Sequence, residues 1–544
     1  MPTSYTVHNV TYTYPAARLP ALREITFSQE AGEVLVVAGA NGAGKSTLLA
    51  TLAGFAPHFF GGHLEGDVYL NGRSMCHTPL AEWVTSVGLV FANPFNQISG
   101  ARLTVFEEIA FGLENIGVPP DEIGRRVNTV IHRLSLTELA NRSPYTLSGG
   151  QQQRVAIASV LVLEPTLLAL DEPTSQLDPE GKRDVLTMLH QIAEGGHHMV
   201  VMATHDLEAT HRLAARGLIL HRGYVVGDAP LPMLLARSEW VQWGITPPLE
   251  IALAQGTWRP WSAPPPPFES SADELALPES LPVHVERVSY RYPTGPEALR
   301  RVSLRVEPGQ IVALVGRNGA GKTTLSKMLN GLLRPSEGQV RLGPHDVSDY
   351  PVATLARWVG YVFQNPADQI FKRTVWDEVA FGPHNLGFST KRLWRAVERA
   401  LALCGLESLA HAHPYDLLPN ERRWVTVASA LAMETPILVL DEPTGGFDRF
   451  DYIRMCHLLR SLRAAGRTIL LITHDMGLVA ELADRMVIVD SGTVVADAPP
   501  RQVLADDELL AKAGLEPPPT VRASRAMGSS RVAYTEEELV ALLD

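Results

Sequence analysis

The sequence lacks the features that would place the chain inside a membrane or outside a cell. It has no run of 18 or more apolar, uncharged residues, so we expect no helix that crosses a bilayer. Residues 1–10 contain no basic stretch followed by an apolar run, so we expect no secretory signal. The three cysteines, Cys76, Cys404 and Cys456, lie far apart and have no metal-ligand spacing. Reduced thiols in a cytosolic protein are therefore expected.

Positive charge is also scarce. The 544 residues include 47 Lys and Arg against 59 Asp and Glu, which gives a formal net charge of -12. Because nucleic-acid binding depends on clustered Lys and Arg, this balance argues against a general nucleic-acid-binding protein.

Hydrophobic residues are plentiful at 45%, and a chain of this length suits two to four domains.

One long sequence pattern occurs twice. Lys45 and Lys322 occupy equivalent positions 277 residues apart, and Asp171 and Asp441 do so 270 residues apart. A repeat of this length indicates two copies of a whole domain rather than a solenoid. The other recurring segments, in chain order, are NVTYTYP (9–15) with RVSYRYP (287–293), FANPFNQI (91–98) with FQNPADQI (363–370), FEEIAFG (106–112) with WDEVAFG (376–382), LALDEPT (168–174) with LVLDEPT (438–444), and MATHD (202–206) with LITHD (471–475).

The repeat and the composition between its copies predict the domain limits. Residues 257–280 include four consecutive prolines, which favour an extended polyproline tether. We expect a first domain over 1–250, a Pro-rich linker over 251–281, a second domain over 282–515 and a tail over 516–544.

The tail contains two kinds of sequence. Residues 516–531, EPPPTVRASRAMGSSR, resemble a loose segment. Thr535 and Glu538 then form a capping-box pattern before an apolar run, which predicts a short helix over 535–543.

Two phosphate-binding motifs carry the first part of the chemistry. EVLVVAG (33–39) and QIVALVG (310–316) have the composition of buried parallel strands, and each leads into G-x-x-x-x-G-K-[ST] and a helical segment. In such a loop, backbone N–H groups close around phosphate oxygens at a helix N-terminus. The lysine would reach the β- and γ-phosphates of ATP, and the hydroxyl after it would hold Mg²⁺. The predicted ATP-binding residues are Gly39, Asn41, Gly42, Gly44, Lys45, Ser46 and Thr47, with Gly316, Asn318, Gly319, Gly321, Lys322, Thr323 and Thr324 in the second copy.

Paired carboxylates supply the second part. TLLALDEP (166–173) and PILVLDEP (436–443) are apolar strands that end in adjacent acids. The first acid, Asp171 or Asp441, suits a Mg²⁺ shell that also includes Ser46 or Thr323. The second acid, Glu172 or Glu442, suits the polarisation of an attacking water. A histidine, His205 or His474, ends a further apolar strand in each half.

Residues 147–154 read LSGGQQQR, and with the motifs above the chain resembles the ABC ATPases over nearly its whole length. The resemblance implies an α/β fold with two tandem P-loop NTPase (ABC ATPase) domains. Each would have a mostly parallel core sheet, an antiparallel β subdomain and a helical subdomain. It also implies a head-to-tail pair in which the LSGGQ signature of one cassette completes the γ-phosphate site of the other. By this resemblance Ser148, Gly149, Gly150 and Gln151 contact ATP, Tyr14 and Tyr292 stack on adenine, and His205 and His474 contact the γ-phosphate.

The sequence departs from this family at two places. Leu418, Pro419, Asn420 and Glu421 stand where the first cassette has Ser148, Gly149, Gly150 and Gln151. These changes remove a hydroxyl and an N–H donor and add a charge that repels phosphate.

The second departure is Ala92, which stands where the second cassette has Gln364, a candidate Mg²⁺ ligand and water-orienting residue. In a head-to-tail pair, both departures belong to the site built on Lys45, while the site built on Lys322 is complete. We therefore predict an ATPase with one complete and one degenerate site. Two working sites that tolerate these variants are the alternative.

The segments QNPADQIF (364–371) and DEVAFGPHNLG (377–387) are similar to the ATPases of energy-coupling-factor (ECF) importers. The resemblance implies uptake of a vitamin, a vitamin precursor or a transition-metal ion. It also implies a transmembrane coupling subunit and a membrane substrate-binding subunit as partners, no nucleic acid, and a peripheral location on the cytoplasmic face of the cell membrane.

Other members of the superfamily are weighed against this interpretation. A soluble tandem-cassette translation factor acting on the ribosome is the main alternative, but it needs a long basic helical linker, whereas residues 255–280 are acidic and proline-rich. DNA-repair ATPases of this kind carry coiled coils or zinc modules, and the sequence shows no heptad run or Cys cluster. Tandem sugar-importer ATPases commonly have a degraded second P-loop, whereas residues 316–323 are complete.

Overall fold

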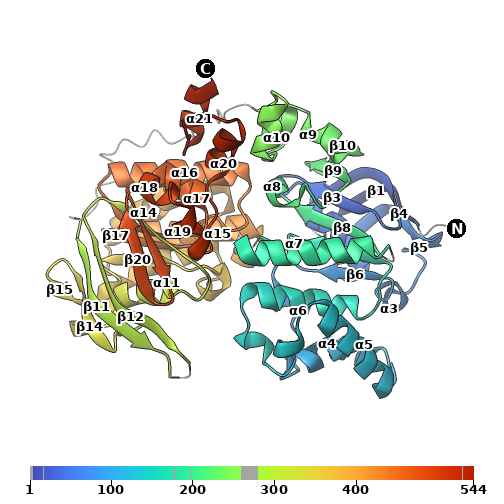
Figure 1. Ribbon diagram of the computed structural model, residues 1–544, viewed down its shortest axis with the longest axis horizontal. Helices are drawn as coiled ribbons and strands as arrows, with labels where there is room; N and C mark the ends of the chain where they lie inside the picture. Colours follow the sequence, from blue (N-terminus) through green and yellow to red (C-terminus); the bar gives the residue numbers. More distant parts are fainter. Residues whose placement is uncertain are drawn as a thin grey trace. The chain divides into compact units, whose positions relative to one another are not determined.

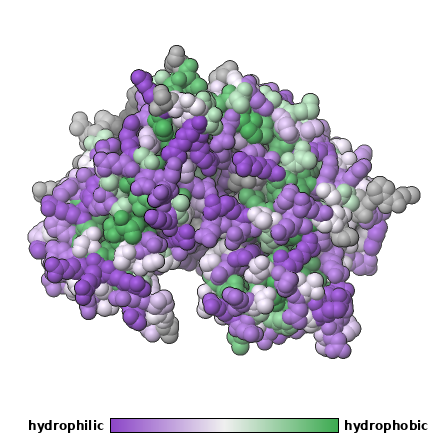
Figure 2. Space-filling view, in the orientation of Figure 1, coloured by the Kyte–Doolittle hydropathy of each residue, from purple (hydrophilic) through white to green (hydrophobic). Residues whose placement is uncertain are grey.

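A computed structural model describes residues 4–258 and 280–543, except residues 16, 176, 178, 197, 294 and 530. The chain divides into two compact units, Met1–Arg259 and Pro260–Asp544 (Figure 1). Most of the predicted linker lies outside the described residues. Among the helices that are described, we find none with both the length and the apolar character needed to cross a bilayer. On the face shown in Figure 2, each unit is mostly hydrophilic, with smaller hydrophobic patches.

The core of the first unit is a six-stranded sheet with the strand order β10-β9-β3-β8-β7-β6. All neighbours pair in parallel except the edge strand β10, which runs antiparallel to β9. Apolar residues fill the central strands because both faces of the sheet are covered. The strands are β3 (Val34–Ala38), β6 (Val87–Val90), β7 (Leu167–Asp171), β8 (Met199–Thr204), β9 (Arg216–His221) and β10 (Tyr224–Pro230).

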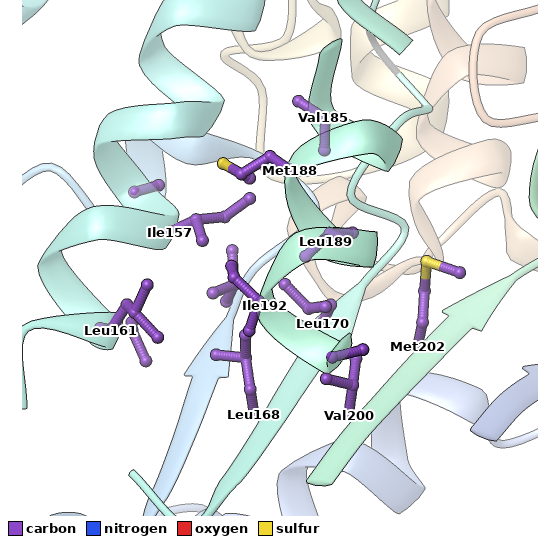
Figure 3. Packing of buried hydrophobic residues seen from close by; sticks show 14 of the residues in the cluster. Ile157, Leu161, Leu168, Leu170, Val185, Met188, Leu189, Ile192, Val200 and Met202 are labelled. Carbon is purple, nitrogen blue, oxygen red and sulfur yellow. The ribbon is translucent and has the colours of Figure 1, made fainter. Parts of the chain in front are cut away.

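One face of this sheet packs against long helices. Helices α6 (Gly149–Leu161) and α7 (Pro179–Glu194) place apolar side chains on alternate residues of β7 and β8 (Figure 3). Ile157 and Leu161 of α6 and Leu189 and Ile192 of α7 are almost fully buried in this cluster. Helices α4 (Val105–Asn115) and α5 (Pro120–Arg133) pack with α6 as a helical subdomain.

The other face packs against α1 (Lys45–Leu52) and a second, antiparallel sheet. Its strand order is β2-β1-β4-β5, with β1 (Ser4–Thr13), β2 (Leu22–Glu30), β4 (His63–Leu70) and β5 (Arg73–Ser74). The short elements of the unit are α2 (Phe55–His58), α3 (Leu80–Trp83), α8 (Leu207–Thr210), α9 (Leu231–Leu235), α10 (Leu249–Ala254) and the 3-10 helices η1 (Pro94–Asn96), η2 (Thr137–Leu139), η3 (Pro144–Thr146) and η4 (Glu239–Val241).

The second unit repeats this plan. Its six-stranded sheet has the order β16-β17-β18-β13-β19-β20, and again only the edge strand β20 is antiparallel. Its antiparallel sheet has the order β12-β11-β14-β15. The strands are β11 (Val283–Arg291), β12 (Glu297–Val306), β13 (Ile311–Val315), β14 (Glu337–Leu342), β15 (His345–Asp346), β16 (Val359–Val362), β17 (Ile437–Asp441), β18 (Thr468–Ile472), β19 (Arg485–Asp490) and β20 (Thr493–Ala498).

The helices of the second unit follow the same order. A parallel core sheet, an antiparallel sheet and a helical subdomain in each unit confirm the predicted fold class. The helices are α11 (Lys322–Leu329), α12 (Val352–Leu355), α13 (Val375–Asn385), α14 (Thr390–Leu403), α15 (Pro419–Ala432), α16 (Arg449–Ala464), α17 (Met476–Leu482), α18 (Pro500–Leu504) and α19 (Asp507–Lys512), with the 3-10 helices η6 (Val347–Asp349), η7 (Pro366–Asp368), η8 (Glu407–Leu409) and η9 (Pro414–Asp416).

The C-terminal segment differs from the sequence prediction. Residues 516–531 are not simply a loose tail, because helix α20 (Pro519–Ala526) forms within them and buries Val521 and Ala523. Pro519 stands at the first helical position, where its fixed φ favours a helix start and its missing N–H costs nothing. The predicted short helix is present as α21 (Glu536–Leu543), with the Thr535 hydroxyl accepting from the Glu538 N–H at 3.2 Å.

We expect the C-terminal helices to contribute to the stability of the second unit. Replacing Leu539, which is fully buried, with alanine should lower the free energy of unfolding by about 2–5 kcal/mol. Leu543→Ala in the same helix is the matched control, because that side chain is 48% exposed and should change little. Denaturant unfolding of both variants measures the difference, and equal effects would show that α21 does not pack as described.

Candidate functional site

The order of strands and motifs that the two units share brings the predicted site residues of each unit to one edge of its core sheet. In the first unit the P-loop follows β3, His205 follows β8, and Asp171 ends β7, and these three strands are adjacent. In the second unit the P-loop, His474 and Asp441 follow or end β13, β18 and β17, which are again adjacent. Since parallel strands end at the same edge, residues that are far apart in the sequence meet there.

Each P-loop folds around its own lysine. The Lys45 Nζ donates to the carbonyl oxygens of Gly39 at 2.8 Å and Ala40 at 3.1 Å, and Lys322 makes the equivalent bonds at 2.7 Å and 2.9 Å. Gly44 precedes α1 in a left-handed conformation with φ 107°, and a Cβ there would lie 2.9 Å from the Ala21 oxygen. Only glycine fits this position. The loop therefore presents backbone N–H groups and an ammonium group at the start of a helix, as binding of a polyphosphate requires.

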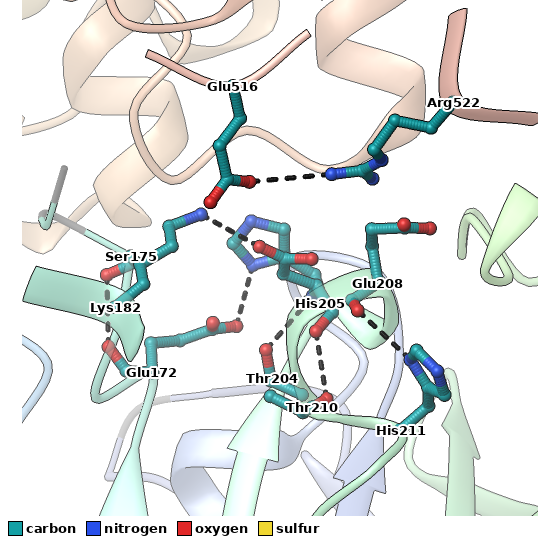
Figure 4. A network of polar contacts seen from close by, with 11 residues as sticks. Glu172, Ser175, Lys182, Thr204, His205, Glu208, Thr210, His211, Glu516 and Arg522 are labelled. Carbon is teal, nitrogen blue, oxygen red and sulfur yellow. Dashed lines mark hydrogen bonds and ion pairs between the residues drawn. The ribbon is translucent and has the colours of Figure 1, made fainter. Parts of the chain in front are cut away.

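The second acid of each pair contacts the histidine. His205 Nδ1 lies 2.8 Å from Glu172 Oε1, and His474 Nδ1 lies 2.9 Å from Glu442 Oε1 (Figure 4 for the first pair). Glu172 and Glu442 both have positive φ, 44° and 50°, an uncommon conformation for a residue with a side chain. The strained backbone turns each carboxylate away from its strand and toward the histidine of the neighbouring strand.

Burial and neighbouring charges shift the pKa values of these groups in opposite directions. Burial alone would raise the pKa of Glu172, but His205 and Lys45 outweigh it and hold that pKa below its usual value. Burial likewise opposes the charge on His205, but Glu172 outweighs it and raises the pKa of the imidazole. For Glu442, the effects of His474 and Lys322 overcome burial and lower the pKa of the carboxyl. The second acid of each pair is thus ionised at neutral pH and can accept a proton or a hydrogen bond from water.

The first acid of each pair lies beside the hydroxyl of the P-loop. The Thr323 Oγ1 donates to Asp441 Oδ2 at 2.9 Å, and Ser46 is hydrogen-bonded to Asp171. Burial raises the pKa of both Asp171 and Asp441 to about 6. Among the described residues, the buried Asp171 Oδ1 has no hydrogen-bond partner. A buried carboxylate with free acceptor capacity next to a hydroxyl fits a hard divalent cation such as Mg²⁺.

The two tyrosines lie against the first helical turn that follows each P-loop. Tyr14 Oη is 3.2 Å from Thr47 Oγ1, and Tyr292 Oη is 3.1 Å from Thr324 Oγ1. Both tyrosines therefore stand next to the loop that would hold phosphate, and their stacking on adenine stays a prediction.

The segments after β6 and β16 contain the predicted site position, which is Gln364 in one unit and Ala92 in the other. They also contain a second glutamine, Gln97 or Gln369, whose role the sequence analysis did not predict. Gln364 is exposed after β16, and Ala92 occupies the equivalent position after β6. Each segment is anchored by a later glutamine, because Gln97 Oε1 accepts from the Phe91 N–H at 3.3 Å and Gln369 Oε1 accepts from the Phe363 N–H at 3.1 Å. The repeated glutamine was a signal in the sequence, but its partner is a backbone group and could not be identified there.

The two signature segments begin their helices differently. Ser148 caps α6, since its Oγ accepts from the Gln151 N–H at 3.4 Å while Gln151 Oε1 accepts from the Ser148 N–H at 3.1 Å. At α15 the residue in the cap position is Leu418, and the carboxylate of Glu421 accepts from its N–H at 2.8 Å. Glu421 thus places a negative charge at the helix N-terminus.

A family comparison identifies the chain. The model of the family described as ABC transporter matches residues 22–175 and 299–445, which is more than half of the sequence. The chain belongs to the ABC transporter family. It therefore carries two ATP-binding cassettes in tandem and is an ATPase, as the sequence motifs predicted.

Curated relatives are consistent with this family. A protein of Methanosarcina acetivorans, provisionally named an ABC transporter ATP-binding protein, is 36% identical over 94% of this chain and 88% of its own length. A similarly named protein of Streptomyces avermitilis is 38% identical over 91% and 94%. Among solved structures, CbiO1 of Clostridium perfringens, described as part of the ABC transporter complex CbiONQ, is 30% identical, covers 46% of this chain and 100% of its own, and gives a TM-score of 0.40. The ATP-binding cassette MJ0796, solved as a dimer with ADP and Pi, is 26% identical, covers 40% and 99%, and gives a TM-score of 0.38.

The pairing of His205 with Glu172 makes a prediction about its protonation. Glu172→Gln removes the charge that raises the pKa of His205, so burial should then bring this pKa below the ordinary value of about 6.5. In the unchanged protein, the histidine's contribution to stability should be present below about pH 6.5 and lost as the pH rises through its raised pKa. NMR titration of the His205 ring measures both pKa values. Glu442→Gln, in the other unit, is the control that should leave this titration unchanged.

Proposed function

We propose that this chain is the ATP-hydrolysing motor subunit of an ECF-type importer that takes up a vitamin, a vitamin precursor or a transition-metal ion. The observation that carries the ATPase part is the repeated arrangement of P-loop lysine, acid pair and histidine at the edge of each core sheet. The importer part rests on the segments 364–371 and 377–387, which resemble ECF ATPases. The chain would act at the cytoplasmic face of the cell membrane through its partners.

We propose the following roles at the site built on Lys322. The P-loop N–H groups and Lys322 hold the β- and γ-phosphates, and Tyr292 stacks on adenine. Thr323, Asp441 and Gln364 would hold Mg²⁺, which neutralises charge that develops on the phosphates. Glu442, ionised at neutral pH, orients and polarises the attacking water, while His474 fixes the Glu442 carboxylate and reaches the γ-phosphate.

The equivalent roles at the other site belong to Tyr14, Lys45, Ser46, Asp171, Glu172 and His205. In the proposed head-to-tail pair, Ser148, Gly149, Gly150 and Gln151 close the Lys322 site, and the segment 417–421 closes the Lys45 site. The Lys45 site would then face the Glu421 carboxylate and would have Ala92 in place of a glutamine. We propose that it binds ATP and turns over slowly, while the Lys322 site carries most of the hydrolysis.

The proposed contact with the membrane partner lies around residues 92–100 and 364–373. In the second unit Phe371 is 59% exposed and packs edge-on against Phe381 at 4.8 Å, and the Lys372 ammonium lies 5.2 Å from the Phe371 ring centre. In the first unit Phe95 and Tyr145, both about half exposed, stack at 6.4 Å. Exposed aromatic pairs next to the segments that follow β6 and β16 suit helices of a transmembrane coupling subunit.

The proposed asymmetry predicts unequal effects of two matched substitutions. Glu442→Gln should lower steady-state ATP hydrolysis by about 100-fold or more, since it removes the group that polarises water. Glu172→Gln should lower it much less. Hydrolysis by the purified full chain, assayed alone and with its co-purifying membrane proteins, measures both rates, and equal losses would contradict the asymmetry.

A further inference from the structure

Helix α15 of the second unit lacks the LSGGQ signature but makes contacts that the equivalent helix of the first unit, α6, does not make. Helices α15 and α16 are equivalent to α6 and α7, with an offset of 270 residues. In the first unit Gly150 and Gly181 pack closely, and a Cβ on Gly150 would lie 3.5 Å from the Gly181 Cα. In the second unit the same two positions are Asn420 and Asp451, and the Asn420 Nδ2 donates to Asp451 Oδ2 at 2.7 Å. Both partners changed together.

A second pair of positions changed in the same way. Arg154 and Asp184 form an ion pair at 3.9 Å between α6 and α7. Their equivalents are Trp424 and Arg454, and the Arg454 guanidinium lies 4.4 Å from the Trp424 ring centre. The Trp424 indole N–H also donates to Asp451 at 2.8 Å. An ion pair has thus been replaced by a cation–π contact with the cation on the opposite helix.

The third pair reaches the catalytic strand. In the first unit the buried Gln153 Nε2 has no hydrogen-bond partner among the described residues, and the Ser175 hydroxyl donates to the Glu172 carbonyl at 3.1 Å. In the second unit the equivalents are Arg423 and Gly445. The Arg423 Nη1 donates to the Glu442 carbonyl at 2.8 Å.

The glycine at 445 leaves room for the Arg423 guanidinium. A Cβ on Gly445 would lie 3.4 Å from Arg423 Nη2, at the edge of ordinary van der Waals contact. The guanidinium thus takes over the bond that the serine makes in the first unit. In all three pairs both residues differ between the units, and the Arg423 bond joins α15 directly to the backbone of Glu442.

Arg423 also changes the charge around the carboxylates. The charged or titratable groups that face Glu442 are Lys322 from α11, Asp441 from β17, His474 after β18 and Arg423 from α15. Burial lowers the pKa of Arg423 to about 10, while Glu442 and Asp441 raise it, so the guanidinium stays positive at neutral pH. The first unit has a neutral glutamine at the equivalent position.

We propose that Arg423 is a positioning residue for hydrolysis at the Lys322 site, where its hydrogen bond holds the backbone of Glu442. This proposal rests on the proposed function, in which Glu442 polarises the attacking water. The altered signature helix therefore serves the catalytic glutamate of its own cassette.

The test compares Arg423→Gln, which restores the residue of the first unit, with Arg423→Lys, which keeps the charge. Arg422→Gln is the matched control, because that cation is adjacent in the sequence but its Nε bonds to the Leu417 carbonyl. We expect Arg423→Gln to lower kcat for ATP about tenfold with little change in KM, since a charge-assisted hydrogen bond is lost. Arg423→Lys should recover part of kcat, and Arg422→Gln should retain it.

Recovery by lysine separates positioning from a structural role. Unchanged kcat in Arg423→Gln would overturn the proposal. A loss of kcat that only follows a loss of thermal stability, with no recovery in Arg423→Lys, would overturn it as well.

The Glu442→Gln variant distinguishes failure of this inference from failure of the proposed function. If Glu442→Gln leaves ATP hydrolysis unchanged, the proposed function fails. If Glu442→Gln abolishes hydrolysis but Arg423→Gln retains kcat, only the role of Arg423 is contradicted.

Discussion

The parallel pairing of adjacent strands is the constraint on which the rest of each unit depends. Strands in a sheet lie about 4.8 Å apart, so groups at the ends of three neighbouring strands are within reach of one another. The P-loop, the acid pair and the histidine end strands β3, β7 and β8 in one unit and β13, β17 and β18 in the other. Apolar side chains on both faces of these strands pack against helices and against the second sheet, which keeps the strands in the interior of the unit. The packing of the strands therefore determines which side chains meet at the candidate site.

Within this frame, the left-handed backbone of Glu172 and Glu442 directs each carboxylate to the neighbouring strand. The contact with histidine offsets the unfavourable burial of the charge, and so the glutamate remains ionised where water would be polarised. Among the described residues, the preceding aspartates, Asp171 and Asp441, make no such contact with a histidine. Their raised pKa values fit carboxylates that would bind a cation. Two adjacent acids thus acquire different properties from their surroundings.

Much of this could be predicted from the sequence, and the remainder has physical reasons for being hidden. Lys45, Asp171 and the fold class followed from local motifs after apolar strands. The Glu172–His205 contact did not, because it joins residues 33 positions apart through sheet order. The positive φ of Glu442 is not encoded by residue type, since only glycine signals such a conformation. Helix α20 was missed because its prolines suggested a loose segment, although Pro519 favours a helix start.

The contacts between α15 and its neighbours could not be predicted from the sequence either. Leu418 and Pro419 indicated only that a phosphate-binding segment had been lost. The compensating residues lie on the neighbouring helix α16 and in the loop that follows β17, so the matched changes emerge only from side-chain contacts. The second signature helix is therefore altered in role rather than merely degraded.

The most direct test of the whole account is a high-resolution structure of the full chain with Mg-ATP bound. The account predicts that the nucleotide held by Lys322 is also contacted by Ser148 and Gly149 of the other cassette. A nucleotide-loaded structure in which Lys322 faces any other segment, or in which each cassette encloses its nucleotide alone, would contradict it.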